Sequence, residues 1–514
     1  MTMKSAATAG FAFILALAPG LGPAVAAAAV EPSVVSADVR VVAAPITSDS
    51  KPFGSLGGQP SKYGYIEEEF FVSGAARAYD WDGRGFSMRA ISAPGPYTIR
   101  ILVLRPGDPK KFSGNAEVEL LNSSRGYDSS ITLETSADLI MARGDVFIGV
   151  TSKALAVNAL KRFDPKRYAD LAWSNPVPEA YRCPAPTIFP SFMKGGAPDS
   201  LLGSNSASED GLIYEIYAQV GAFLKSNRRG VILPGFARPR LFSTGTSQSG
   251  MLQRTYVNAF HPVLRLPGGG PIYDGYLIEV APGAERINQC SEDIFPGDPR
   301  NLLRRVDAPI INILSEGDMW LGRYNRQPNR IARRSGLVRY EVAGGAHLPG
   351  MSRATEASDV PAGRGGGDPV FPRGYVSRAA LIHLQRWAGA GETPPAGRLL
   401  QIRDRRIVRD VNGNAVGGVR SVWLDAPIAR YEGSTGVGEG AVTGRRTPFS
   451  PEKVRELYPT REVYAAKVKS VADKLISEGW LLKQDEGAVV SNATSQVLSS
   501  GLTDSPPDCS GACK

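Results

Sequence analysis

Short apolar runs alternate with longer amphipathic stretches from about residue 116 onward, and this alternation restricts the possible folds more than any other feature. The apolar runs have the length and composition of strands; they are 116–121, 146–150, 240–243, 276–280, 310–314 and 338–342. The amphipathic stretches have the length of helices; they are 131–141, 211–224, 251–260 and 376–387. Strands that alternate with helices predict a mostly parallel sheet covered by helices on both faces.

The pattern changes before and after this α/β core, which we place at 111–395. Residues 30–110 read as strands and turns, with strands expected at 65–72 and 97–104. Residues 396–514 form a mixed C-terminal decoration and tail, with a helix expected at 464–476. An insertion at about 163–209, rich in Pro, Ser and Gly, is either a lid over the functional site or a structural wrap.

The first 29 residues follow the three-part pattern of a secretory signal peptide. Lys4 supplies the positive charge, an apolar run follows at 6–17, and mostly small residues close the segment at 24–29. A buried helix or membrane anchor is the alternative, but the apolar run is short and stops before Pro19. We expect a mature chain that begins near Val30 and a secreted or periplasmic protein with no stable membrane span.

Four cysteines fit an oxidising compartment, where an even number predicts disulfides. Cys183 and Cys290 can join two segments near the functional side of the core, and Cys509 and Cys513 can close a small loop in the tail. Four separate thiols are the alternative. No histidine stands at ligand spacing from a cysteine, so no metal site is expected.

The formal net charge of +9 is spread along the chain, with short basic clusters at 330–334 and 403–406. These clusters lack interleaved aromatic residues and match no known nucleic-acid-binding motif, so we expect no nucleic-acid partner. A basic solvated surface explains the charge more simply than a preference for acidic substrates or anionic surfaces.

The segment 241–250, LFSTGTSQSG, carries the strongest chemical signal in the chain. The expected strand is followed by the pattern small-x-Ser-x-small, where x is any residue, and then by a helix. This is the pattern of a nucleophile elbow. Ser247 stands at the apex, where a tight turn lifts its hydroxyl clear of the sheet. Gly245 and Ser249 are the two small residues, with Ser249 in place of the usual glycine. Ser243 and Ser249 are weaker candidates, and a plain Gly/Ser turn is the alternative.

The partners of Ser247 follow downstream. Of the three histidines, His383 lies within an expected helix, and His261 lies one helix length from the elbow. His347 lies in a glycine-rich loop directly after the strand 338–342, where such a sheet presents a base. Asp318 follows the preceding strand at a spacing suited to the orienting acid, with Glu316 as the alternative acid.

The order Ser247, Asp318, His347 predicts a triad in which His347 takes the serine proton and Asp318 orients the imidazole. A tetrahedral intermediate also needs hydrogen-bond donors for its oxyanion. The backbone N–H of Gln248 opens the helix after the elbow and is one expected donor. We expect the other donor from the loop after strand 116–121, where the N–H of Ser123 or Ser124 is the candidate.

The chain resembles the large secreted alpha/beta-hydrolase-domain proteins of bacteria over about 65–482. The segments that carry the resemblance are 67–74, 119–122, 245–250, 315–318, 342–347 and 412–420. The resemblance implies the alpha/beta-hydrolase fold, ester hydrolysis in general and a C-terminal region integral to the fold. It implies little about the substrate.

We therefore expect an exported serine hydrolase that cleaves a small-molecule or polymeric carboxylic ester through an acyl-enzyme. A peptidase or an acyltransferase with the same triad is one alternative, and a non-catalytic binding protein on a hydrolase fold is another. No cofactor motif is visible in the chain, and this chemistry needs no cofactor.

Overall fold

A ten-stranded sheet runs through the computed structural model, which describes residues 33–83, 85–184, 206–295, 297–319, 336–348, 373–436 and 440–496. The strand order is β14-β13-β12-β10-β7-β8-β6-β3-β2, and β9 pairs with β6 off this path. The expected signal peptide at 1–29 and the expected tail disulfide between Cys509 and Cys513 lie outside the described residues.

The strands from β14 to β8 pair in parallel along the sheet. They are β7 (Asn115–Leu120), β8 (Val146–Val150), β10 (Arg240–Thr246), β12 (Gly275–Glu279), β13 (Ile310–Ser315) and β14 (Leu337–Val342). All six coincide with apolar runs expected to be strands. Because they are parallel, their carboxyl ends meet at one edge of the sheet, and the loops that leave this edge are neighbours.

The N-terminal strands extend the same sheet in antiparallel fashion. They are β2 (Arg40–Ala43), β3 (Tyr65–Ala76) and β6 (Gly95–Pro106), and the short β9 (Ala172–Trp173) pairs with the start of β6. β6 joins the two parts of the sheet, since it pairs antiparallel with both β3 and β8. The fold is thus the expected mostly parallel α/β sheet with an antiparallel N-terminal part.

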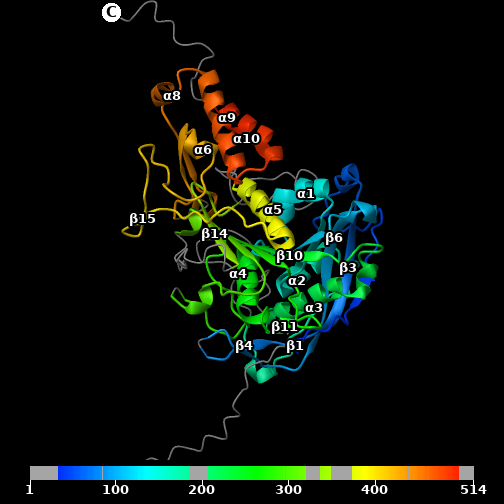
Figure 1. The fold of residues 1–514 in the computed structure, drawn as a ribbon. Coiled ribbons are helices and arrows are strands. Elements are labelled where there is room, and N and C mark those ends of the chain that lie inside the picture. Colours follow the sequence, from blue (N-terminus) through cyan, green and yellow to red (C-terminus); the bar gives the residue numbers. More distant parts are fainter. Residues whose placement is uncertain are drawn as a thin grey trace, which may run out of the picture.

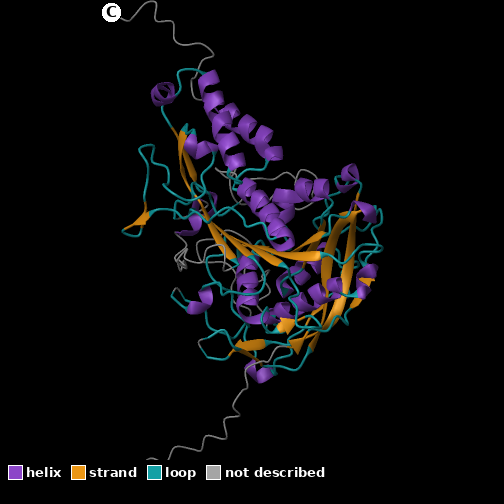
Figure 2. Ribbon diagram, in the orientation of Figure 1, coloured by secondary structure: helices purple, strands orange, loops and turns teal. Residues whose placement is uncertain are grey.

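Helices cover both faces of the sheet (Figures 1 and 2). On one face lie α1 (Ile131–Arg143) and α5 (Gly374–Ala390), whose apolar side chains share one buried cluster with the residues of β13 and β14. On the other face lie α2 (Ala154–Phe163), α3 (Ile213–Lys225) and α4 (Gln248–Thr255), the last continued by a π-helical turn at Tyr256–Phe260. Helix α2 is the one of these that the sequence pattern did not single out.

Local signals explain where α1 begins and ends. The Ser130 hydroxyl accepts the N–H of Leu133, and the buried Glu119 carboxylate accepts the N–H groups of Ile131 and Thr132. At the other end, Gly144 adopts a left-handed conformation with φ of 78° that favours glycine. A Cβ at Gly144 would also lie 2.0 Å from the Lys111 carbonyl oxygen, so no other residue fits this turn.

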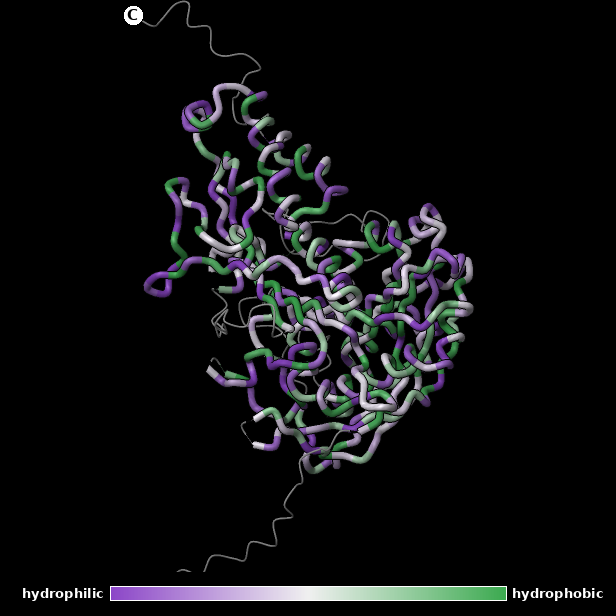
Figure 3. The backbone as a smooth tube through the Cα atoms, in the orientation of Figure 1, coloured by the Kyte–Doolittle hydropathy of each residue, from purple (hydrophilic) through white to green (hydrophobic). Residues whose placement is uncertain are grey.

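The C-terminal region packs against the face covered by α1 and α5 (Figure 1). Its helices are α6 (Val422–Asp425), α7 (Gly440–Thr443), α8 (Pro451–Leu457), α9 (Arg461–Ser477) and α10 (Glu486–Ser495), and its hairpins pair β15 (Ile402–Arg403) with β16 (Arg406–Ile407) and β17 (Ala429–Glu432) with β18 (Arg445–Pro448). Helix α9 contains the expected helix 464–476. Hydrophobic residues gather in the sheet and beneath these helices, whereas the tip of the β15–β16 hairpin is hydrophilic (Figure 3).

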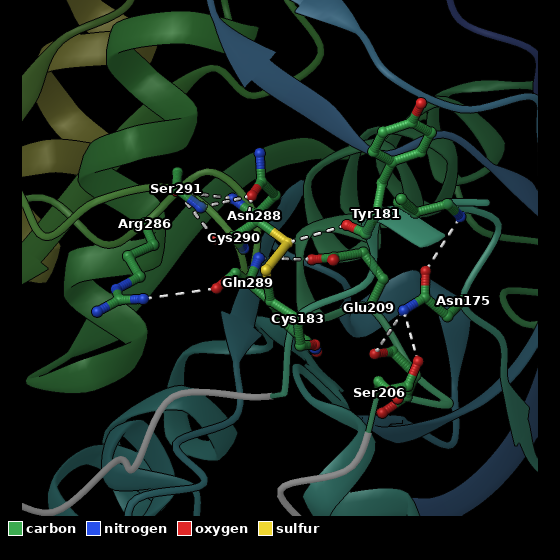
Figure 4. The surroundings of a disulfide bond; sticks show 12 residues. Asn175, Tyr181, Cys183, Ser206, Glu209, Arg286, Asn288, Gln289, Cys290 and Ser291 are labelled. Carbon is green, nitrogen blue, oxygen red and sulfur yellow. Dashed lines mark hydrogen bonds between the residues drawn. A yellow bond between two sulfur atoms is a disulfide. The ribbon is translucent and has the colours of Figure 1, made fainter. Parts of the chain in front are cut away.

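A disulfide joins Cys183 to Cys290, one of the pairings that the sequence allows (Figure 4). The side chain of Gln289 donates to the Cys183 carbonyl at 2.8 Å, and its backbone N–H donates to Glu209 at 2.9 Å. The loop 286–291 therefore holds both described ends of the insertion against the core.

Among the described helices, none combines the length and the apolar character needed to cross a membrane.

Candidate active site

The loop between β10 and α4 places Ser247 at the apex of a sharp turn. Ser247 has φ of 57° and ψ of −120°, a conformation that residues other than glycine seldom adopt and that is often found at functional sites. Its N–H donates to the Glu279 carbonyl at 2.9 Å, and α4 begins at the next residue, Gln248. The turn holds the Ser247 side chain at the carboxyl edge of the sheet.

Close packing between β10 and α4 explains the small residues around the turn. A Cβ at Gly245 would lie 2.9 Å from both the Ser249 carbonyl oxygen and the Gln253 side chain. Ser249 is tolerated because its hydroxyl folds back on Thr246, accepting the N–H at 3.1 Å and donating to the carbonyl at 3.0 Å. The second close approach falls on Gly250, where a Cβ would lie 2.9 Å from the Gly245 carbonyl oxygen.

Ser247, His347 and Asp318 form one continuous chain of hydrogen bonds. His347 Nε2 lies 2.8 Å from Ser247 Oγ, and His347 Nδ1 lies 2.7 Å from Asp318 Oδ1. The three residues come from loops after β10, β14 and β13, so the parallel sheet brings them together from positions far apart in the chain. Asp318 is fully buried, while 12% of the His347 side chain is exposed.

The surroundings of Asp318 keep it ionised. Burial favours the neutral acid, but the His347 ring and both the N–H and the hydroxyl of Ser315 favour the carboxylate, and together they hold the pKa of Asp318 below its ordinary value. The two bonds from Ser315 to Asp318 Oδ2 measure 2.7 and 2.8 Å, which leaves Oδ1 to bind the imidazole.

Glu316, the alternative acid, is bound by other groups. Its Oε2 accepts the Gly344 N–H at 2.7 Å, and its Oε1 lies 2.7 Å from the Arg409 guanidinium and 3.3 Å from the Gly433 N–H. Glu316 therefore joins the His347 loop to the C-terminal region, and Asp318 is the carboxylate in contact with the imidazole.

The other two histidines are held elsewhere in the fold. His261 is buried between the Tyr276 hydroxyl at 2.7 Å and Asp307 at 2.6 Å. His383 Nε2 lies 2.7 Å from the Gly479 carbonyl oxygen. Ser243 is also buried, with its hydroxyl bonded to Tyr217 and Gln253.

Comparison with known proteins gives the family. Residues 41–491 match the family described as "Alpha/beta hydrolase domain". The chain belongs to this alpha/beta-hydrolase family. No curated protein matches the chain.

Solved structures that resemble this hydrolase include esterases and a peptidase. Acetyl xylan esterase 1 from Thermoanaerobacterium sp. has 13% identity and a TM-score of 0.26, with 55% of this chain and 73% of that chain covered. Carboxylesterase Cest-2923 from Lactobacillus plantarum has 8% identity and a TM-score of 0.23, with 47% and 72% covered. A prolyl endopeptidase structure has 10% identity and a TM-score of 0.23, with 49% and 30% covered.

The loop that carries Ser123, one expected oxyanion donor of this hydrolase, contacts the side chain of Gln248, the other expected donor. Gln248 is the first residue of α4, so its N–H has no acceptor inside the helix. The Ser123 N–H lies 3.4 Å from the Gln248 side-chain oxygen, a long contact. The Ser124 N–H instead donates to the Asn122 side chain at 2.9 Å. Of the two serines, Ser123 is thus the one that faces Gln248.

Three residues that the sequence pattern did not single out hold these loops in place. Asn122 donates from Nδ2 to the Thr246 carbonyl at 2.7 Å and so fastens the Ser123 loop to the elbow. Glu279 and Arg373 form a buried ion pair next to Ser247 and His347. A polar residue at the end of an apolar strand, such as Glu279 at the end of β12, was the available signal, but it does not show which residue it pairs with.

In the described part of the chain, no group of three or more His, Cys, Asp or Glu side chains is arranged to hold a metal ion.

Proposed function

We propose that this alpha/beta hydrolase is a serine hydrolase that cleaves a carboxylic ester through an acyl-enzyme. The hydrogen-bond chain from Ser247 through His347 to Asp318 carries the proposal. The Ser247–His347 link has the distance that proton transfer requires, and the Asp318–His347 link holds the imidazole in place. The strained conformation of Ser247 supports it, since such strain concentrates where a side chain is presented for chemistry.

The reaction follows from this geometry. Ser247 Oγ attacks the carbonyl carbon while His347 Nε2 accepts the hydroxyl proton, and Asp318 stabilises the imidazolium and holds its tautomer. The N–H groups of Gln248 and Ser123 donate to the oxyanion. To do so, the Ser123 N–H gives up its long hydrogen bond to the Gln248 side chain and binds the oxyanion instead. His347 then protonates the leaving alcohol, and an acyl-enzyme remains.

Water completes the cycle. His347 removes a proton from a water molecule, which attacks the acyl-enzyme carbonyl, and returns that proton to Ser247 as the free acid leaves. An alcohol in place of water would give acyl transfer, and an amide in place of the ester would give peptide cleavage. Both reactions use the same three side chains, so the acceptor and the leaving group distinguish these alternatives.

We also propose that the protein acts outside the cytoplasm. The Cys183–Cys290 disulfide is consistent with a secreted or periplasmic protein, because such bonds persist in oxidising compartments. The charged start and the apolar run of residues 1–29 agree with this location.

A fluorophosphonate probe with mass-spectrometric mapping tests the nucleophile. We expect the wild-type protein to be labelled at Ser247 and Ser247→Ala to remain unlabelled, with hydrolysis of p-nitrophenyl acetate reduced roughly 10⁴–10⁶-fold. Ser249→Ala is the matched control: it removes a neighbouring serine of the same turn and should still be labelled. Absence of labelling on the wild-type protein would favour a binding role for the fold.

A substrate panel then separates the reaction classes. We expect p-nitrophenyl esters to be cleaved at least about 100-fold faster than the matched p-nitroanilides, because the leaving anilide needs stronger protonation than the leaving phenoxide. Equal rates would favour a peptidase. Faster product formation on addition of a primary alcohol, with an alkyl ester as product, would favour an acyltransferase.

A further inference from the structure

A buried ion pair between Glu279 and Arg373 contacts the backbone of both Ser247 and His347. Arg373 precedes α5, its side chain is fully buried, and its Nη1 lies 2.6 Å from Glu279 Oε2. The Ser377 hydroxyl, one turn into α5, donates to the same carboxylate oxygen. Glu279 is the last residue of β12, so the pair joins the sheet to α5 at the carboxyl edge where the site lies.

Each member of this pair also binds the backbone of one reacting residue. The carbonyl of Glu279 accepts the Ser247 N–H at 2.9 Å. On the other side, Arg373 Nη2 donates to the His347 carbonyl at 3.1 Å. A continuous path therefore runs from the Ser247 backbone through the ion pair to the His347 backbone, and it closes a ring with the 2.8 Å contact between the two side chains.

The backbone next to Glu279 is strained in a way that fits this role. Val280 has φ of 42°, although it is β-branched and fully buried. Such a conformation costs on the order of 1–3 kcal/mol and persists only where the surrounding structure imposes it. Here the Val280 N–H donates to the Ile313 carbonyl at 2.8 Å, so the sheet holds the turn that directs the Glu279 carbonyl toward Ser247.

Stability alone does not explain why this pair is buried here. Removing an arginine and a glutamate from water is costly, and well-packed apolar residues of similar volume often stabilise a core equally well or better. A guanidinium differs from an apolar side chain, and from lysine, because its planar fork donates in two fixed directions at once. Arg373 uses that property to bind the Glu279 carboxylate and the His347 carbonyl together.

We propose that Glu279 and Arg373 are positioning residues that set the distance between Ser247 and His347, an inference that rests on the proposed function. Their hydrogen bonds to the site reach the backbone of Ser247 and of His347 and not the Ser247 hydroxyl or the His347 ring. Their loss should therefore lower kcat and leave KM nearly unchanged, because substrate still binds while proton transfer occurs from a poorer geometry.

Substitution of Arg373 tests the proposal, with Arg378 as the matched control. Arg378 lies on α5, is equally buried, and pairs with Asp138 of α1 and Asp485 of the C-terminal region. We expect Arg373→Lys and Arg373→Met to lower kcat on p-nitrophenyl acetate about 100-fold, with KM changed by less than about 3-fold. Arg378→Lys should lower the thermal midpoint by a similar amount and leave kcat nearly unchanged.

A double variant separates positioning from stability. Arg373→Met alone leaves the Glu279 carboxylate buried without its cation, whereas Glu279→Gln with Arg373→Met removes both charges. We expect the double variant to recover much of the lost thermal stability and none of the lost kcat. Recovery of kcat together with stability would overturn the proposal, as would a loss of kcat in Arg378→Lys that matches the loss in Arg373→Lys.

A crystal structure of Arg373→Met provides a readout that does not depend on catalysis. We expect Ser247 Oγ and His347 Nε2 to move beyond hydrogen-bond distance of each other. If they stay within hydrogen-bond distance, the positioning role is wrong even where activity falls. The proposed function is judged separately by probe labelling of the wild-type protein, so failure of one proposal is distinguishable from failure of the other.

Discussion

The guanidinium of Arg409 lies 2.7 Å from the fully buried carboxylate of Glu316. Arg409 belongs to the C-terminal region, and Glu316 follows β13, two residues before Asp318. The other oxygen of Glu316 accepts the N–H of Gly344 in the loop that carries His347. A distant part of the chain is thus attached to both loops that supply the partners of Ser247.

Arg409→Met should destabilise the protein, because the Glu316 carboxylate would stay buried without its cation. The Arg409 side chain is 27% exposed, so water can partly solvate the Glu316 carboxylate once the guanidinium is removed. We therefore expect the free energy of unfolding to fall by about 1–3 kcal/mol. Urea denaturation followed by tryptophan fluorescence measures this change. Arg403→Met on the exposed β15–β16 hairpin is the control and should change stability little; equal losses in both variants would contradict the assignment.

Asp318→Asn and Glu316→Gln should differ sharply in activity. Asparagine keeps the shape of Asp318 but favours the wrong tautomer of His347, so kcat should fall roughly 10³–10⁴-fold. Glu316→Gln should cost about 10-fold at most, because Glu316 binds Gly344 and Arg409 and makes no contact with the imidazole. Ester hydrolysis at saturating substrate measures both, and a larger loss in Glu316→Gln would reverse the two roles.

Removal of the Cys183–Cys290 disulfide should lower stability. The two cysteines are 107 residues apart, and a loop of that length restricts the unfolded chain enough to contribute about 5 kcal/mol. We expect Cys183→Ser with Cys290→Ser to lower the midpoint of urea unfolding accordingly. Addition of a reductant should lower the wild-type midpoint toward that of the double variant and leave the variant unaffected. A wild-type midpoint insensitive to reductant would contradict this prediction.

Stability should fall with rising pH in part through Glu209. Burial raises the pKa of its carboxyl from 4.5 to about 7, although the Gly211 and Gln289 N–H groups partly oppose the shift. The folded protein thus holds this proton more tightly than the unfolded chain, so the contribution is complete below pH 4.5 and is lost as the pH rises through 7.

Glu209→Gln should remove this part of the pH dependence. Relative to the variant, the wild-type free energy of unfolding should drop by about 3 kcal/mol between pH 4.5 and pH 8, because one pKa unit corresponds to about 1.4 kcal/mol. Urea unfolding at a series of pH values measures the difference. Glu179→Gln, an exposed position, serves as the control, and curves that stay parallel for wild type and Glu209→Gln would show that the proton is not linked to folding.

Periodic patterns in the sequence predicted the parallel strands of the core, its helices other than α2, and the position of the elbow at Ser247. These features depend on neighbours close along the chain: apolar residues at strand or helix spacing, and small residues on either side of Ser247. Of these small residues, Gly245 and Gly250 lie where a strand and a helix almost touch. The loop positions of Asp318 and His347 followed in the same way, because each comes directly after a strand.

The tertiary structure alone decided which side chains meet across the site. Glu316 and Asp318 occupy one short turn, and their spacing cannot say which carboxylate contacts His347, since Arg409 and Gly433 bind Glu316 from more than 90 residues away. Asn122, Glu279 and Arg373 went unrecognised for the same reason. The spacing of apolar residues along the chain predicts which residues are buried. The partner of a buried polar group depends instead on how distant segments pack.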